Sequence, residues 1–159
     1  MSPPKPKSAG SPNQQLDSFL AKFTPEMAKF ARRALVRMRK RLPNAIEMVY
    51  DNYNALVIGF APNERPSDAI FSIAIFPRKI ALCFLQGAKL SDPHKRLRGS
   101  GNVVRNVRVD DISVLDDLQV VSLMDEALRR AKVRMDLKQK RKLVIRSISA
   151  KQRPRRPSP

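Results

Sequence analysis

The segment AIFSIAIFPRKIALCFLQ, residues 69–86, determines the fold that the sequence predicts. It contains two apolar runs, 70–76 and 80–85, joined by Pro-Arg-Lys at 77–79. Apolar runs of this length, rich in Ile and Phe and separated by a short connection with a proline, are typical of an antiparallel hairpin at the centre of a sheet. We therefore expect a central β-hairpin in this segment.

The two faces of this hairpin differ in side-chain size, because successive residues of a strand point to opposite sides of the sheet. We expect the face with large apolar side chains to form the core. The face with small side chains is neither polar enough for water nor bulky enough to form a second core, so something should cover it. The large residues are Phe71, Ile73, Ile75, Ile80, Leu82 and Phe84, and the small ones are Ser72, Ala74, Ala81 and Cys83.

Length and composition indicate one domain. A chain of 159 residues with 42% hydrophobic content can bury one substantial core. Segments with helical and with strand periodicity are both present, which predicts an α+β fold with a largely antiparallel sheet backed by two long helices. We expect this domain to span residues 14–135, between a disordered Pro-rich tail at 1–13 and a disordered basic tail at 136–159.

The charge is strongly positive and unevenly distributed. The formal net charge is +18, of which +9 lies in residues 133–159 and +2 in residues 1–13. This balance favours polyanions as partners. The only cysteine lies in an apolar strand, and no run approaches the length of a membrane span, so we expect a cytoplasmic protein with no membrane partner.

Helix signals precede the hairpin. A short helix is expected over about 14–22, and Thr24 followed by Pro25 is a strong start signal for a second helix that runs to about Arg41. Its apolar residues fall on one arc and seven basic residues on the rest. Strands are expected at about 46–50 and 55–60, with Val57 and Gly59 on the small face.

The segment after the hairpin contains loops, one strand and one helix. Residues 103–109 alternate in a way that suits an edge strand. Asp116 or Asp117 should begin a final helix to about 132, with inward residues that include Leu118, Val121 and Met124. Beyond 135 we expect a mobile tail, unless the apolar residues of segment 143–148 dock on the domain.

The order of these pieces resembles the YdhG-like domain family, whose function is unknown. The resemblance covers about residues 14–132, and its most specific part is the stretch from FLQGAKLSDP to LRGSG. It implies a compact α+β domain with a sheet backed by helices, and some members of the family are looked on as frataxin-like iron chaperones. The matching residues are Leu42-Pro43, Glu47, Tyr50, 84–93, 97–101, Arg105 and 127–131.

The sequence predicts no metal site and no cofactor. Iron needs clustered oxygen ligands, whereas the first long helix is basic and carries only Glu26 near its start, so an iron-chaperone role is disfavoured. Four carboxylates, Asp110, Asp111, Asp116 and Asp117, form the one acidic cluster. Helix capping explains them better than cation binding, because no EF-hand spacing is present.

No catalytic constellation is visible, so we expect a non-catalytic binding module for a small ligand or a partner protein. His94 has no Ser or Cys placed to pair with it, and burial of Cys83 in an apolar strand argues against a nucleophile. Segment 87–101, a ligand or a second subunit in a homodimer could cover the small face. The candidate ligand-binding residues are Ser72, Ala74, Ala81, Cys83, Gly87, Lys89, Asp92, Arg98, Gly99, Gly101 and Arg105.

The alternative function is non-specific association with nucleic acid. Aromatic residues make up 6% of the chain and fall mostly in the expected core, so stacking on bases is not expected. Contacts would go to phosphates from the basic helix and from the basic tail. The candidate residues are Arg33, Arg37, Lys40, Arg41, Lys138, Lys140, Arg141 and Lys142.

Overall fold

The structure is a computed structural model that describes residues 10–158. The first helix, α1 (Pro12–Leu20), begins earlier than predicted because Ser11 and Gln14 form a capping box and Pro12 occupies the first turn. The predicted disordered tail 1–13 is therefore too long at its C-terminal end. Residues 1–9 of that tail lie outside the described part of the chain.

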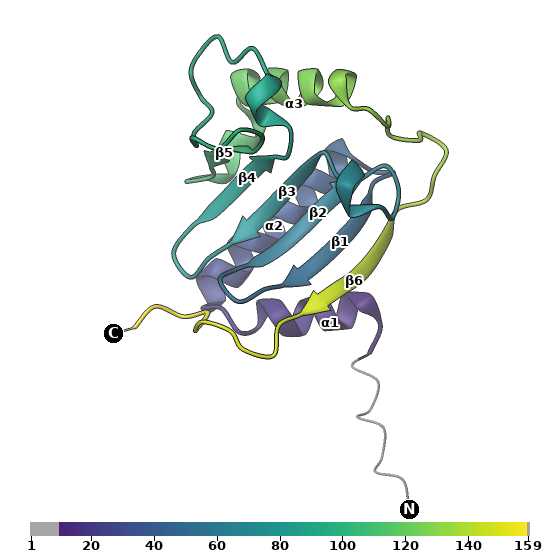
Figure 1. The fold of residues 1–159 in the computed structure, drawn as a ribbon. Helices are drawn as coiled ribbons and strands as arrows, with labels where there is room; N and C mark the ends of the chain where they lie inside the picture. The colour runs from purple at the N-terminus through teal and green to yellow at the C-terminus, as the bar shows by residue number, and fades with distance from the viewer. Residues whose placement is uncertain (1–9, 159) are drawn as a thin grey trace, which may run out of the picture.

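The second helix, α2 (Pro25–Arg41), confirms the start signal read from the sequence. The Thr24 side chain accepts a hydrogen bond from the Met27 amide, and Pro25 supplies a preset first-turn conformation. The inward face is buried at Ala31, Ala34, Leu35 and Met38, as the apolar arc predicts. α1 and α2 lie together behind the sheet in Figure 1.

Six strands form one sheet in the order β5-β4-β3-β2-β1-β6. The predicted hairpin is confirmed as β3 and β4, with Ile73 opposite Leu82, and the residues predicted for an edge strand do form the edge strand β5. All neighbouring strands are antiparallel except β1 and β6, which are parallel. The strands are β1 (Ile46–Asp51), β2 (Leu56–Ala61), β3 (Phe71–Ile75), β4 (Ile80–Phe84), β5 (Arg105–Arg108) and β6 (Lys142–Ile148).

The face of the sheet that carries large side chains is the core, as alternation predicts. Every large residue of the hairpin on this face is fully buried, and they form one cluster with the inward residues of α1 and α2. Phe71 and Phe84 pack edge to face, with ring centroids 5.6 Å apart. We call this side the core face.

The last helix, α3 (Leu118–Arg130), begins where predicted, and Met124 is buried as predicted, but the first turn does not face the core. Asp117 accepts a hydrogen bond from the Gln119 amide as the N-cap. The buried residues are Val120, Leu123 and Met124, whereas Leu118, predicted to point inward, is 84% exposed. The prediction for Leu118 is wrong because the helix packs beside the β4 end of the sheet and not flat on it (Figure 1).

The structure contradicts the prediction that residues 136–159 form a disordered tail. Its segment β6 pairs with β1, and Leu143 is buried in the core cluster, so the tail completes the sheet as an edge strand. Hydrophobic residues at 143–145 dock there because β1 would otherwise present an unpaired edge. The domain therefore extends well beyond residue 135.

Two buried carboxylates on β1 hold this C-terminal segment. Glu47 accepts hydrogen bonds from Arg39 of α2 and from Arg141, which precedes β6. Asp51 pairs with Lys22 at 2.7 Å and with Arg155 at 2.9 Å. Each carboxylate thus joins one cation from the helical layer to one from the C-terminal segment.

Minor elements occupy three of the connections. They are the short 3-10 helices η1 (Pro66–Asp68), η2 (Gly87–Lys89) and η3 (Ile112–Asp116). Asp111 caps η3 through the Ser113 amide. Within residues 10–158, no helix has the length and apolar character that crossing a membrane requires.

Candidate functional site

The sheet face opposite the core is the candidate binding surface, and we call it the open face. The predicted small residues share it, because Ser72 pairs with Cys83 and Ala74 with Ala81 in the β3–β4 register. Gly59 of β2 lies opposite Ser72 and extends the floor. The helices α1 and α2 pack on the other side, so the bulky and small residues are divided as the sequence predicts.

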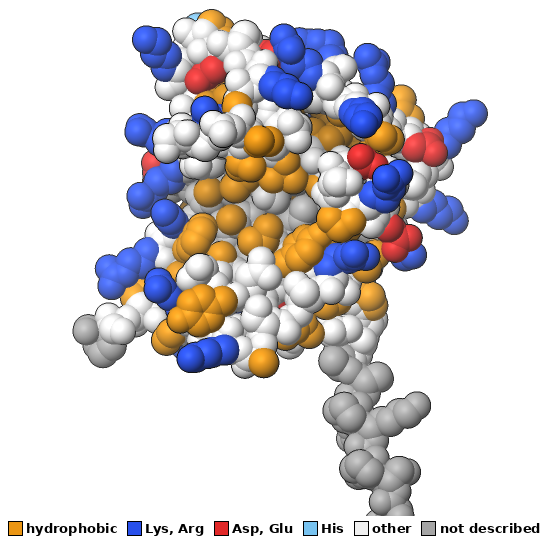
Figure 2. Space-filling view, viewed as in Figure 1, with side chains coloured by type: hydrophobic (Ala, Val, Ile, Leu, Met, Phe, Trp, Pro, Cys, Tyr) orange, Lys and Arg blue, Asp and Glu red, His pale blue; other side chains and the backbone are white. Residues whose placement is uncertain are grey.

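Figure 2 shows the open face as a hollow lined by hydrophobic side chains, with Lys and Arg side chains around its margin. One end of the hollow is covered by the connection between β2 and β3. There Ala69 packs against a small cluster of Ile46, Met48 and Ala61. Of the three alternatives for covering the floor, segment 87–101 does not do so, because it folds beside β5 and α3.

The margin of the open face along β4 and β5 is basic. A cavity of about 400 Å³ lies there, lined by Ala81 and Asn106 of the floor, by the cations of Lys79, Arg98 and Arg108, and by one carboxylate, Asp110. Arg108 pairs with Asp110 at 2.6 Å. Lys79 and Arg98 have no carboxylate within 4.0 Å in the part of the chain that the structure describes. The margin therefore carries uncompensated positive charge.

Cys83 is a half-buried thiol on the open face. Burial raises the pKa of the Cys83 thiol, and a hydrogen bond with Ser72 only partly opposes this rise. A raised pKa keeps the group as a thiol at neutral pH, which is the unreactive form. The arrangement suits a packing residue and does not supply an activated nucleophile.

The predicted residues of segment 87–105 are engaged mainly with one another. A side chain at Gly87 would lie 2.6 Å from Arg105 Cβ, so this position is fixed by close packing. Asp92 accepts hydrogen bonds from the Arg96 and Leu97 amides, which close the loop on itself. Arg105 donates to backbone carbonyls of the same loop, including Val104 at 2.9 Å. The loop is thus self-supporting.

The remaining predicted ligand residues separate into two places. Arg98 lines the basic margin of the open face, and its backbone bridges Asn106. Gly99 has φ of +119° and Gly101 is exposed, which places both in the turn towards β5. Lys89 lies elsewhere, beside a cavity under the end of α3. The structure therefore does not gather the eleven predicted residues into one site.

A cavity of about 460 Å³ lies between the end of α3 and the end of the sheet where β3 begins. The sequence analysis does not predict it, because its walls come from three separate segments of the chain, 67–70, 86–90 and 127–133. Alternation and helix periodicity describe single elements and do not report where a helix end meets a sheet end. Only Lys89 among its lining residues was predicted as a ligand residue.

The acidic cluster is spread over separate structural tasks. Asp111 and Asp117 cap η3 and α3, and the pKa of each is lowered, first by hydrogen bonds with Ser113 and Arg96 respectively. Asp110 pairs with Arg108, and Asp116 with Arg37. Among residues 10–158 no three His, Cys, Asp or Glu side chains are grouped as metal ligands.

The predicted polyanion residues fall into paired and unpaired sets. Arg37, Arg141 and Lys142 pair with Asp116, Glu47 and Glu64. Within the described chain no carboxylate lies within 4.0 Å of the other five, which are Arg33, Lys40, Arg41, Lys138 and Lys140. The unpaired set thus lies on α2 and on the segment before β6.

Sequence reasoning missed the buried charges Glu47, Asp51 and Arg155. Arg155 is 4% exposed although it lies in a segment rich in Arg and Pro. An acidic residue on the core side of a strand indicates a buried cation partner, but it does not identify that cation.

Comparison of the chain with protein-family models, with curated proteins and with solved structures finds no match.

Proposed function

We propose that this protein is a non-catalytic, YdhG-like binding module that takes a partner protein on the open face of its sheet. The observation that carries the proposal is the one-sided sheet. Its core face is covered by helices, whereas its open face presents a hollow of small and apolar residues within the described chain (Figure 2). Such a surface on a folded domain is typical of an interaction site.

The basic margin favours an acidic partner over a second copy of this chain. Lys79 and Arg98 border the floor without a carboxylate partner. A homodimer through the open faces would bring two such margins together, and like charges at an interface are unfavourable. A partner helix with apolar residues towards the floor and Asp or Glu towards the margin meets both requirements.

Cys83 provides a direct test, since it is the only cysteine and lies on the floor of the open face. The probe is an amphipathic helical peptide with Glu on its polar side, and the control peptide has Lys at the same positions. The reaction is run at alkaline pH, where part of the thiol is ionised. We expect the Glu peptide to slow alkylation of Cys83 by iodoacetamide, and the Lys peptide to leave the rate unchanged. Equal rates with both peptides and without peptide would contradict the proposal.

A charge-reversal variant sharpens the test. Lys79→Glu and Arg98→Glu together should abolish protection by the Glu peptide, because they remove the margin charge that steers it. Lys29→Glu and Lys40→Glu, on the exposed side of α2, form the matched control and should leave protection intact. Sedimentation of the protein alone should show a monomer if the open face does not bind itself.

A second candidate function is weak, non-specific association with nucleic acid. The observation that favours it is the set of basic side chains without carboxylate partners, among them Lys138 and Lys140. Deleting residues 133–159 would not test this function cleanly, because that deletion removes β6 and Arg155. Lys138→Gln with Lys140→Gln removes the charge and keeps the strand.

The expected result is a change in salt dependence. If both lysines contact phosphates of duplex DNA, the slope of log K against log salt should fall by about 2. The matched control is Arg141→Gln, which loses a cation that pairs with Glu47 and should alter stability more than the slope. An unchanged slope in the double variant would remove this segment from the DNA contacts.

A further inference from the structure

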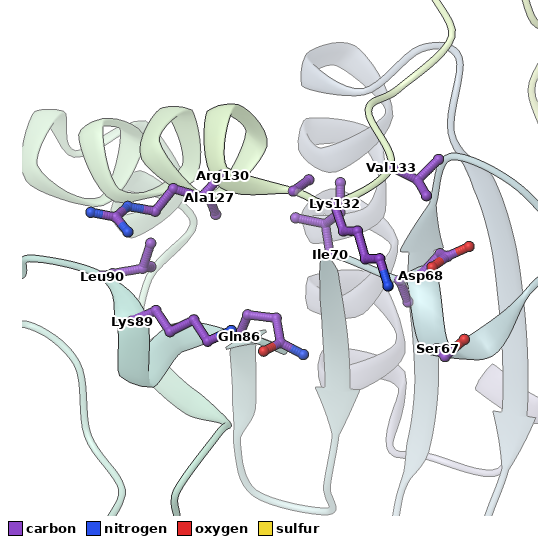
Figure 3. Close-up of a pocket in the computed structure, with 12 residues that line it drawn as sticks. Ser67, Asp68, Ile70, Gln86, Lys89, Leu90, Ala127, Arg130, Lys132 and Val133 are labelled. Carbon is purple, nitrogen blue, oxygen red and sulfur yellow. The ribbon is translucent and has the colours of Figure 1, made fainter.

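The cavity under the end of α3 is separate from the floor of the open face and has its own chemistry. Figure 3 shows it between the last turn of α3 above and the ends of β3 and β4 below. The space remains open because α3 presents Ala127 and Ala131 here, which are too small to reach Ile70 and Leu90 opposite. Its volume of about 460 Å³ falls within the range of small-molecule sites, about 300–1,000 Å³.

The lining is apolar in its walls and cationic at its edges. Ile70 and Leu90 pack against the core cluster from below, and Ala127 closes the cavity from above. Figure 3 shows Lys132 reaching down from the segment after α3, and Lys89 extending along the lower edge towards Gln86. A ligand here would find apolar contacts along its body and an ammonium group on either side.

The charges of the lining are not balanced within the cavity. Arg130 pairs with Glu126 at 2.8 Å, and Asp68 accepts a hydrogen bond from Asn63 at 3.0 Å and lies 3.8 Å from Arg65. Lys89 and Lys132 have no carboxylate within 4.0 Å among residues 10–158. The two lysines are therefore the groups available to an anion.

We propose that this cavity binds a small amphipathic carboxylate, whose charged end lies between Lys89 and Lys132 and whose apolar body contacts Ile70, Leu90 and Ala127. Hydrogen bonds from ammonium groups to a carboxylate are charge-assisted and stronger than neutral ones. The apolar body adds a favourable term that grows with the apolar area removed from water. This inference does not depend on a partner for the open face.

The test uses the full chain, labelled with ¹⁵N, titrated with sodium octanoate and followed by amide chemical shifts. We expect saturable shifts at Ala69, Ile70 and Leu90 and over residues 127–133. Octanol at the same concentrations supplies the apolar body without the charge, and it should bind at least tenfold more weakly because the lysines gain no partner. Absence of saturable shifts around the cavity would overturn the proposal, as would equal binding of octanol.

Two variants test separately how the lysine charges and the space of the cavity contribute to octanoate binding. Lys89→Gln with Lys132→Gln should weaken octanoate binding about tenfold, whereas Lys29→Gln with Lys40→Gln on α2 should not. Ala127→Leu should fill the cavity and prevent binding while the amide spectrum stays that of the folded protein. Unchanged affinity in the first variant or in Ala127→Leu would overturn the assignment of this site.

The readouts keep this proposal distinct from the partner on the open face. Octanoate shifts confined to Ala81 and Cys83 would place the ligand on the open face and would contradict the cavity site. Protection of Cys83 by the acidic peptide has no bearing on Lys89 or Lys132, which line the other cavity. Either proposal can therefore fail while the other stands.

Discussion

The two faces of this sheet are built from the same strands and have opposite properties. Ile73 and Ala74 are neighbours in β3 and both are buried, yet Ile73 belongs to the helix-covered core cluster and Ala74 lies on the floor of the opposite face. The core face even encloses the charges of Glu47 and Asp51, because cations from two layers meet them there. Burial of large side chains is therefore concentrated on the face that the helices cover.

The largest expected effect comes from unpairing a charge on the core face. Asp51→Asn leaves Arg155 buried and without its carboxylate, and breaking a buried pair in this way costs about 3–5 kcal/mol. Urea unfolding followed by circular dichroism measures the loss. Asp110→Asn is the control, since its pair with Arg108 is exposed and is expected to contribute at most about 1 kcal/mol. Similar losses of stability in both variants would show that the buried pair contributes no more than the exposed pair.

The next effect concerns apolar packing. Ile73→Ala should lower the free energy of unfolding by about 2–5 kcal/mol, because it removes a fully buried side chain and leaves a cavity. Ala81→Ser on the open face should change it by no more than about 0.5 kcal/mol, as substitutions away from the core do. The same urea experiment tests both, and a large loss in Ala81→Ser would show that the open face is also a core.

At acidic pH, the free energies of unfolding of the wild type and of Asp51→Asn should become more similar. Burial of Asp51 by itself raises the pKa, but hydrogen bonds from Lys22, Gln152 and Arg155 outweigh it, so the pKa of Asp51 lies below its usual value. The stability that Asp51 contributes is therefore present above its unfolded pKa of about 3.9 and is lost as pH falls through the lower folded pKa. Unfolding curves at pH 7 and at steps below pH 4 measure this loss. If the difference in free energy of unfolding between the two proteins stays constant as pH falls, this prediction is wrong.

The smallest effect is expected from added bulk on the open face. Ala74→Phe should lower the free energy of unfolding by less than about 1 kcal/mol, because its ring can extend out of the hollow. Ile73→Phe, one residue away in the packed core, should cost about 1–3 kcal/mol. If the acidic peptide binds the floor, Ala74→Phe should also reduce its protection of Cys83. A cost for Ala74→Phe equal to that for Ile73→Phe would show that something already fills the hollow.

Sequence reasoning predicted the parts whose signals lie within one element. The hairpin followed from alternation across residues 70–85, and the start of α2 from Thr24 and Pro25. The burial of Leu118 was mispredicted because an apolar residue in the first turn of a helix points inward only if the helix lies flat on the core. The periodicity of apolar residues within one helix does not show how that helix is oriented on the core.

The C-terminal segment was mispredicted for a different reason. Its basic and proline-rich composition resembles that of a disordered tail, and this outweighed the short apolar run at 143–145. What orders the segment is the pair of acidic residues on β1, which lie about a hundred residues earlier. The cavity under α3 was missed on the same grounds, since no single segment contains it.

The parallel pairing of β6 with β1 has a consequence for the order of folding. Antiparallel neighbours from β1 to β4 are close in sequence and can pair early, but Glu47 and Arg141 are 94 residues apart, and contacts over such separations form slowly. Until β6 arrives, the outer edge of β1 exposes unpaired backbone N–H and C=O groups. Such an edge is a template for another chain. The folding intermediate without β6 is therefore the species in which this protein is most exposed to aggregation.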